Sequence, residues 1–103
     1  MTAFLKAKGL TAKRRAAKRR AKLAAYRRVC AEVDKRDGPR CRICRRHWDL
    51  LAEHHHIQFR SRGGTDTTDN LIRVCGGCHA DIHAKRLQVT GNANGQLQIA
   101  RTA

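Results

Sequence analysis

The chain has 103 residues, enough for one small domain but not for a second, and so short a chain leaves little room for a hydrophobic core. Lys and Arg total 23 against 8 Asp and Glu, which gives a formal net charge of +15 with the six histidines neutral. This balance indicates a polyanion as partner, and the scarcity of aromatic residues argues against a fold stabilised by buried rings.

The sequence of the first 38 residues predicts a basic helix, and the end of this helix marks the boundary between two segments of the chain. Residues 1–28 carry eleven Lys or Arg and no acid. From Thr11, a predicted N-cap, good helix formers continue without Gly or Pro as far as Gly38-Pro39. We therefore divide the chain into an N-terminal arm and helix, 1–38, and a domain, 39–103.

The two halves of this helix differ in what they can contact. Apolar side chains recur at helical spacing over residues 23–33, so this half is expected to pack on the domain. They are Leu23, Tyr26, Cys30 and Val33, with Cys30 as a core residue. Residues 11–22 have only alanines as apolar side chains, so this half is either a solvated helix or an arm ordered by its partner. Its candidates for DNA contact are Lys13, Arg14, Arg15, Lys18, Arg19 and Arg20, and a solubilising tail is the alternative.

After the boundary the sequence predicts short elements. A tight turn at 41–44 leads to an extended segment over 48–59 and a loop over 60–69 made of glycine, hydroxyl and charged residues. A β-branched strand over 71–74 precedes a helix over 76–86. A β-hairpin over 87–99 follows, in which Leu87 and Val89 mirror Leu97 and Ile99 across a turn signal at 92–95.

Four of the five cysteines form two Cys-x-x-Cys pairs, Cys41 with Cys44 and Cys75 with Cys78. Zn²⁺ prefers four thiolates in a closed tetrahedron, and a domain of this size is small enough to need such a staple. The odd cysteine count also argues against complete disulfide pairing. We therefore predict a structural zinc site.

No apolar run approaches the roughly 18 to 20 residues that span a bilayer, and the N-terminus lacks the features of a signal peptide. We therefore expect a cytoplasmic protein without a membrane partner. A reducing compartment also favours metal ligands over disulfides.

Five of the six histidines lie in two short segments. These are His54, His55 and His56 in the first, and His79 and His83 in the second. Imidazole titrates near neutrality and binds metals, so it can serve as general base and as ligand. His79 and His83 share one face of the predicted helix, which its two cysteines would hold at the zinc.

Over residues 41–83 the sequence resembles the HNH endonuclease family, the zinc-containing branch of the ββα-metal (His-Me finger) nucleases. The matching elements are, in order, Cys41-x-x-Cys44, His55-His56-Ile57, Arg60 to Gly64, Asp69-Asn70-Leu71 and Cys75-x-x-Cys78-His79-x-x-x-His83. The resemblance implies a small α+β fold, in which an HNH domain stapled by a four-cysteine zinc site follows the basic helical arm and precedes the hairpin.

The resemblance also implies roles for single residues. His56 matches the family's general base, and Asn70 matches the residue that tethers the loop after the base. The residues that match the family's ligands of the catalytic divalent ion are His55, His79 and His83.

The triple histidine admits a register shifted by one. The position of Ile57 and the fourteen-residue step from His56 to Asn70 favour His56 as the base. His54 is then a neighbouring histidine that either lies at the surface or contacts the metal ligands without binding the ion itself. A regular strand would point His55 and His56 to opposite faces, so both can serve one phosphate only if the strand ends or bulges there.

These roles suit hydrolysis of a DNA phosphodiester bond, which needs an activated water and positive charge where negative charge develops. Neutral His56 would take the proton of the water, and the ion would bind a phosphate oxygen and the departing 3′ oxygen. The resemblance implies 5′-phosphate and 3′-hydroxyl ends. Because imidazoles are softer ligands than carboxylates, Mn²⁺, Ni²⁺, Co²⁺ and Zn²⁺ compete with Mg²⁺ as the working ion, and the sequence does not choose among them.

Double-stranded DNA is the expected partner, with weak sequence specificity because nothing in the sequence indicates base reading. Arg60 and Arg62 lie just beyond the base in a Gly-Gly loop, where bidentate contacts to phosphate are sterically open, and an ordinary solvated loop is the alternative. Cutting both strands would need a dimer, two encounters, or a partner protein in a larger DNA-processing assembly.

Two other protein classes explain part of the pattern. A zinc-ribbon nucleic-acid-binding module without catalysis accounts for the charge and the cysteines, and a ribosomal-type RNA-associated protein accounts for the arm and the small size. Neither gives a role to the histidines at nuclease spacing.

Overall fold

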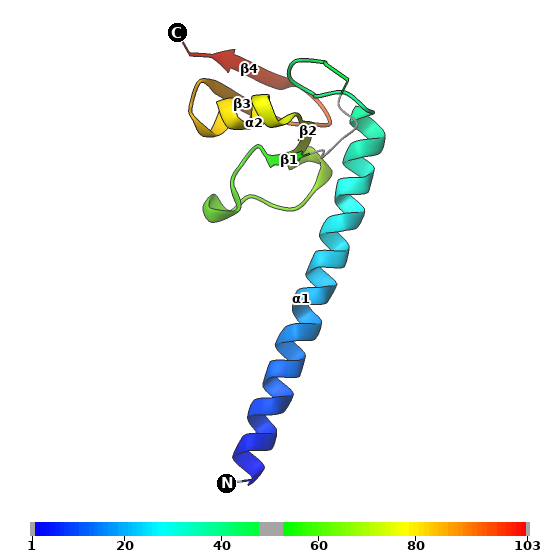
Figure 1. Ribbon diagram of the computed structural model, residues 1–103, viewed down its shortest axis with the longest axis vertical. Coiled ribbons are helices and arrows are strands. Elements are labelled where there is room, and N and C mark those ends of the chain that lie inside the picture. The colour runs from blue at the N-terminus through cyan, green and yellow to red at the C-terminus, as the bar shows by residue number, and fades with distance from the viewer. Residues whose placement is uncertain (1, 48–52, 103) are drawn as a thin grey trace.

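A long helix carries the rest of the chain at its C-terminal end (Figure 1). The computed structural model describes residues 2–47 and 53–102, and its longest dimension is 62 Å. The elements are α1 (Thr2–Asp37), β1 (Glu53–His56), β2 (Leu71–Val74), α2 (Gly76–His83), β3 (Leu87–Gly91) and β4 (Leu97–Arg101). Short 3-10 turns occupy Arg60–Arg62 and Thr68–Asn70.

Helix α1 begins earlier than expected. It starts at Thr2 rather than at Thr11, so the predicted N-cap was wrong. The only helix breaker before Thr11 is Gly9, and one interior glycine costs only about 1 kcal/mol, which the flanking helix formers offset. The helix ends as predicted, because Gly38 adopts a left-handed conformation (φ +68°) and donates its N–H to the Asp34 carbonyl at 2.9 Å.

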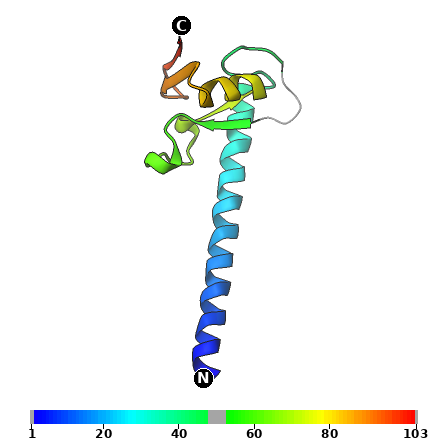
Figure 2. The same ribbon diagram turned by 60° about the vertical axis from the view of Figure 1, so that its left-hand side comes forward.

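The face of α1 that docks on the domain is shorter than predicted. Val33 is fully buried against the domain, but Tyr26 and Cys30 are only half-buried and Leu23 is 48% exposed. The assignment of Cys30 to the core was therefore wrong. The N-terminal part of α1 extends away from the domain (Figure 2), which is why the apolar stripe of the helix is only partly covered.

The described residues of the domain form two antiparallel two-stranded sheets and one short α-helix, so the small α+β class is confirmed. Strand β1 pairs with β2, with His55 opposite Ile72 and His56 opposite Leu71. The extended segment predicted over 48–59 is regular only from Glu53 to His56, and residues 48–52 lie outside the described part of the chain. A core of aliphatic side chains and cysteines joins β2, α2 and β3. Its buried aliphatic members include Ile72, Val74, Ile82, Leu87 and Val89.

Helix α2 stops at His83 and not at Arg86 as predicted. Lys85 takes the left-handed conformation (φ +62°), and the Arg86 N–H donates to the Asp81 carbonyl at 2.9 Å, so a Schellman turn closes the helix and leads into β3. The predicted hairpin is confirmed, but it reaches Arg101 and pairs Val89 with Ile99.

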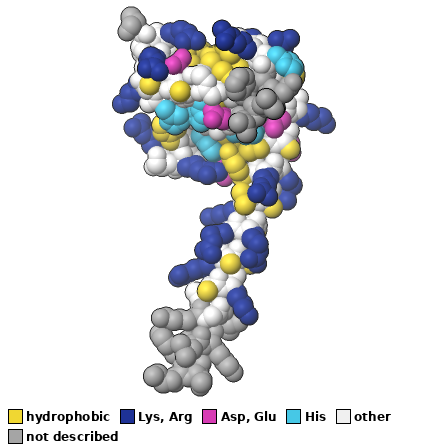
Figure 3. All heavy atoms as spheres, in the orientation of Figure 1, with side chains coloured by type: hydrophobic (Ala, Val, Ile, Leu, Met, Phe, Trp, Pro, Cys, Tyr) yellow, Lys and Arg dark blue, Asp and Glu magenta, His cyan; other side chains and the backbone are white. Residues whose placement is uncertain are grey.

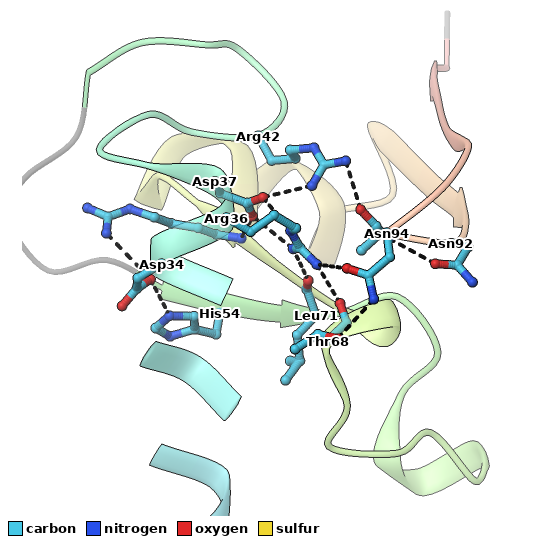
Figure 4. A network of polar contacts seen from close by, with 11 residues as sticks. Asp34, Arg36, Asp37, Arg42, His54, Thr68, Leu71, Asn92 and Asn94 are labelled. Carbon is cyan, nitrogen blue, oxygen red and sulfur yellow. Dashed lines mark hydrogen bonds and ion pairs between the residues drawn. The ribbon is translucent and has the colours of Figure 1, made fainter. Parts of the chain in front are cut away.

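A polar network fastens the end of α1 to the domain (Figure 4). Arg36 donates hydrogen bonds to the carbonyls of Thr68 and Leu71, each at 2.6 Å. The Asp37 carboxylate accepts from Arg36 and Arg42 and from the backbone N–H of Arg73. The C-terminal turns of α1 are thereby built into the domain. Within residues 2–47 and 53–102, no helix is both long and apolar enough to cross a bilayer.

Candidate active site

The four paired cysteines meet in one cluster. Cys41 and Cys44 come from the turn that follows α1, while Cys75 caps α2 and Cys78 lies in its first turn. Their four sulfurs lie within 4.8 Å of one another, and the Sγ atoms of Cys44 and Cys75 are 3.9 Å apart. Four Zn–S bonds of about 2.3 Å in a tetrahedron would place sulfurs about 3.8 Å apart. The cluster therefore fits Zn²⁺.

The backbone around the cluster favours a thiolate at one cysteine. Burial raises the pKa of Cys41, but hydrogen bonds from the backbone of Cys44, Cys75 and Ile43 outweigh burial and bring this pKa to about 7. For Cys78, burial and the neighbouring thiols act in the same direction and raise the pKa. Four thiolates this close together need a cation between them, which is what a zinc site provides.

Alternation along β1 separates the three consecutive histidines. His55 points toward α2, where it meets His79 and His83, whereas His54 and His56 contact groups from α1 and the following loop. Each histidine of the strand therefore has different partners. Figure 3 shows histidine side chains gathered on the domain together with acidic groups, above a helix that carries many Lys and Arg side chains.

His55, His79 and His83 form a second candidate metal centre. Their ligand nitrogens lie within 4.8 Å of one another, and the Nε2 atoms of His79 and His83 are 3.0 Å apart. His55 is only 3% exposed. Its burial, and next the charges of His79 and His83, lower its pKa to about 4. A neutral imidazole at pH 7 is the form that binds a metal ion.

Glu53 orients one of these ligands. The Nδ1–H of His79 donates to Glu53 Oε2 at 2.9 Å, which leaves the lone pair of His79 Nε2 directed at the cluster. A carboxylate on the far nitrogen of a ligating histidine is a common arrangement in metal sites. Glu53 belongs to no motif of the sequence, but it stands two residues before His55 and so shares its face of the strand, which is the signal that points to it.

His56 lies outside this cluster and is held by a different set of groups. Its Nε2 is 2.7 Å from Asp66 Oδ1, and its ring is stacked on Tyr26 of α1, with centroids 6.0 Å apart and planes 8° from parallel. Arg60 donates to the same Asp66 oxygen at 2.9 Å and lies 4.7 Å above the Tyr26 ring. The bond from Arg60, the strongest influence on it, holds the pKa of Asp66 below its usual range. Neither Tyr26 nor Asp66 was predicted as a neighbour of His56, because they lie 30 residues before it and 10 residues after it in the sequence.

Asn70 ties down the segment that follows His56. Its side chain is buried, accepts from the backbone N–H of Gln58 at 2.8 Å and donates to the carbonyls of Gln58 and Thr65. Gly64 supports the same loop, because a Cβ at this position would lie 1.8 Å from the Gln58 carbonyl oxygen. These hydrogen bonds connect Asn70 to the loop after His56, where the family resemblance implies a tether, and its role in catalysis stays a prediction.

The other candidate residues lie outside the cysteine cluster and the histidine cluster. His54 bonds Asp34 of α1 at 2.7 Å and so belongs to the junction between helix and domain. Arg60 keeps 57% of its side chain exposed despite its bond to Asp66, and Arg62 is exposed in the same loop. The arm candidates are exposed along α1. They are Lys13, Arg14, Arg15, Lys18, Arg19 and Arg20.

Comparison with known proteins finds a family match over the segment that holds both clusters. Residues 41–85 match the family described as HNH endonuclease. A stretch of 31 residues, 30% of the chain, is 48% identical to the "Type IV methyl-directed restriction enzyme EcoKMcrA" of Escherichia coli (strain K12), and it spans 11% of that enzyme's length. No solved structure matches the chain. Residues 41–85, which hold both the cysteine cluster and the histidine cluster, belong to the HNH endonuclease family.

Proposed function

We propose that this protein is a metal-dependent endonuclease that hydrolyses phosphodiester bonds of double-stranded DNA. The observation that carries the proposal is the cluster of His55, His79 and His83 within the family-matched segment, beside the strand that also presents His56. The 41–83 core would then be a ββα-metal domain, since β1, β2 and α2 follow one another in that order.

The two clusters suit two different ions. The four cysteines would hold Zn²⁺, with a structural role. The three histidines would hold a divalent cation, and three imidazoles favour Mn²⁺, Co²⁺, Ni²⁺ or Zn²⁺ over Mg²⁺, which prefers oxygen ligands. When bound there, such a cation supplies positive charge to the phosphate and the leaving oxygen.

His56 is our proposed general base. Because the Asp66 carboxylate accepts a hydrogen bond from Nε2–H, the imidazole keeps its basic lone pair on Nδ1. That nitrogen would take a proton from the attacking water while the water oxygen bonds to phosphorus and the bond from phosphorus to the 3′ oxygen breaks. The departing oxygen would take a proton from solvent and become the 3′-hydroxyl. Strand β1 ends at His56, so the chain leaves the regular pleat there, and we place the scissile phosphate at this strand end.

Asn70 and Asp66 would position the base without touching the substrate. Asn70 fixes the backbone at Gln58, two residues after His56, and Asp66 fixes one ring nitrogen. The proposed reaction leaves a 5′-phosphate and a 3′-hydroxyl end, as the family resemblance implies.

The test is cleavage of supercoiled plasmid by the purified protein in EDTA, Mg²⁺, Mn²⁺, Co²⁺ or Ni²⁺, with nicked and linear products separated on a gel. We expect cleavage with at least one transition metal and none in EDTA. His56→Ala should abolish it, whereas His54→Ala, the neighbouring histidine bonded to α1, should retain it. Metal-dependent cleavage of equal rate in the wild type and His56→Ala would refute the assignment of the base. DNA binding without cleavage under every condition would favour the zinc-ribbon binding module instead.

A further inference from the structure

The docking face of α1 continues beyond the domain as a line of basic side chains. Tyr26 stacks on His56 and Val33 is buried, so both residues mark the face of α1 that looks toward the domain. Arg15, Arg19 and Lys22 precede Tyr26 by eleven, seven and four residues. At about 100° per residue these three lie within about 40° of Tyr26 around the helix.

These three side chains are exposed, and residues 2–31 contain no acid to neutralise them. The same helical face therefore changes from apolar to basic at the point where it leaves the domain. We call Arg15, Arg19 and Lys22 the aligned bases.

A groove joins this face to the candidate active site. It has a volume of about 630 Å³ and runs between α1 and the loop after β1, with Lys22 and Tyr26 on one wall and Arg60 and Asp66 on the other. His56 lies next to it, because it stacks on Tyr26 and bonds Asp66. Lys22 and Arg60 thus place one cation on each wall of a groove that adjoins the proposed general base, and Leu23, Ala25 and Val29 add an apolar stretch to the α1 wall.

The chemistry of the aligned bases selects the backbone of duplex DNA as the occupant. Residues 9–25 contain no aromatic side chain on which an unpaired base could stack. The aligned bases present cations along one side of a straight helix that stands clear of the domain (Figure 1). Phosphates are therefore the groups that we expect this face to bind, since most protein–DNA hydrogen bonds go to phosphate and sugar.

We propose that the aligned bases form a one-sided track that guides the duplex backbone along α1 into the groove beside His56. This inference rests on the proposed nuclease function. It differs from a diffuse electrostatic attraction, in which every base of the arm would count equally.

The test compares two triple variants with the same change in net charge. Arg15→Ala, Arg19→Ala and Lys22→Ala together remove the aligned bases. Arg27→Ala, Arg28→Ala and Lys35→Ala together remove three exposed bases that lie about 100° or more away from Tyr26 on the same helix and are not among the candidates for DNA contact. Alanine keeps the helix propensity high in both variants, and circular dichroism checks that both remain helical.

We expect the aligned triple to lower kcat/KM for nicking at least tenfold and the opposite triple to lower it less than threefold. The slope of log affinity against log salt, measured on a 30-bp duplex, should fall by about 2 to 3 in the aligned triple and by less than 1 in its control. Similar losses in the two variants would overturn the track, and so would no loss in either.

The outcome can be separated from that of the proposed function. Binding of the 30-bp duplex needs no catalysis, so the salt slopes decide on the track even if the wild type fails to cleave. Conversely, cleavage that depends on His56 but responds equally to the two triples would support the nuclease and reject the track.

Discussion

Side-chain alternation along β1 determines what each of its residues can do. Glu53 and His55 both face α2. His55 is therefore a candidate metal ligand, and Glu53 accepts the hydrogen bond that orients His79, another candidate ligand. His54 and His56 face the opposite way, where Asp34 and Asp66 accept their hydrogen bonds. Four adjacent residues thereby serve three separate purposes: a metal centre, a proposed base and a structural joint.

Replacing one zinc ligand should unfold the domain. Cys41→Ser removes a thiolate from a site whose binding energy is also folding energy, so we expect zinc to be lost and the cooperative melting transition to disappear. Zinc content by atomic absorption and the melting curve measure both effects. Cys30→Ser is the matched control, because Cys30 is half-buried and outside the cluster, and it should keep its zinc. A Cys41→Ser protein that melts normally with zinc bound would contradict the four-cysteine site.

Glu53→Gln should weaken the histidine centre without unfolding the protein. The amide is a poorer acceptor for His79 Nδ1–H, so we expect affinity for Mn²⁺ or Co²⁺ to fall about 10- to 100-fold. Isothermal titration of the zinc-loaded protein measures this affinity. Asp81→Asn, which breaks surface ion pairs with Arg86 and Arg101, is the control and should bind the ion normally. Unchanged affinity in Glu53→Gln would show that Glu53 does not orient the ligand.

At the scale of elements, the joint between α1 and β2 holds the arm and the domain together. Asp34 and Asp37 lie on the last turns of the helix, and both face Arg73 of β2, a residue only 9% exposed. The helix therefore supplies charges that the domain needs, so the proposed division at Gly38-Pro39 separates segments that depend on each other.

Asp37→Asn should lower the free energy of unfolding by about 3 kcal/mol, because it leaves the half-buried Arg36 and Arg42 without their counter-charge. The Asp37 side chain is 1% exposed. Burial, the largest influence, raises its pKa, but the bonds from Arg36, the Arg73 backbone and Arg42 together outweigh burial and lower it. Its stabilising effect is therefore complete above the unfolded-state pKa of about 3.9 and is lost as the pH falls through the folded value.

Urea unfolding at pH 7 and at acidic pH tests this prediction. The gap in stability between wild type and Asp37→Asn should narrow as the solution is acidified below about pH 4. Glu32→Gln, an exposed position on the same helix, should change stability by less than about 0.5 kcal/mol. A gap that stays constant down to low pH would mean that the charge of Asp37 is not what stabilises the joint.

At the scale of the whole molecule, most of the net positive charge and the contacts with the domain lie in different parts of α1. The part of α1 before Tyr26 adds most of the net positive charge, while the described contacts with the domain come from Tyr26 onward. Removing residues 2–22 should therefore leave the melting temperature within about 3 °C of the wild type, since surface changes away from packed contacts cost little.

The same deletion should weaken duplex binding and flatten its dependence on salt. Nine Lys and Arg are removed, so the slope of log affinity against log salt should fall by several units. Fluorescence anisotropy between about 50 and 200 mM salt spans the range in which such contacts are lost. A truncated protein with an unchanged slope would show that the arm makes no phosphate contacts.

The sequence by itself determined the features that depend on local spacing. Two Cys-x-x-Cys pairs bring sulfurs together within single turns, His79 and His83 share a face because four residues make about one helical turn, and Gly38-Pro39 ends the helix. The order and spacing of these motifs carried the resemblance to the HNH endonuclease family, whose model matches residues 41–85. These are short-range relations that one segment of chain can specify alone.

Only the tertiary structure decided which distant side chains meet. Asp66 and Tyr26 reach His56 because the loop and α1 pack on one face of β1, and Glu53 reaches His79 because α2 packs on the other. Cys30 and Leu23 have apolar spacing yet remain partly exposed, because α1 leaves the domain before its stripe ends. Such contacts depend on the angle between elements, and that angle comes from the packing of the whole core and not from any single segment.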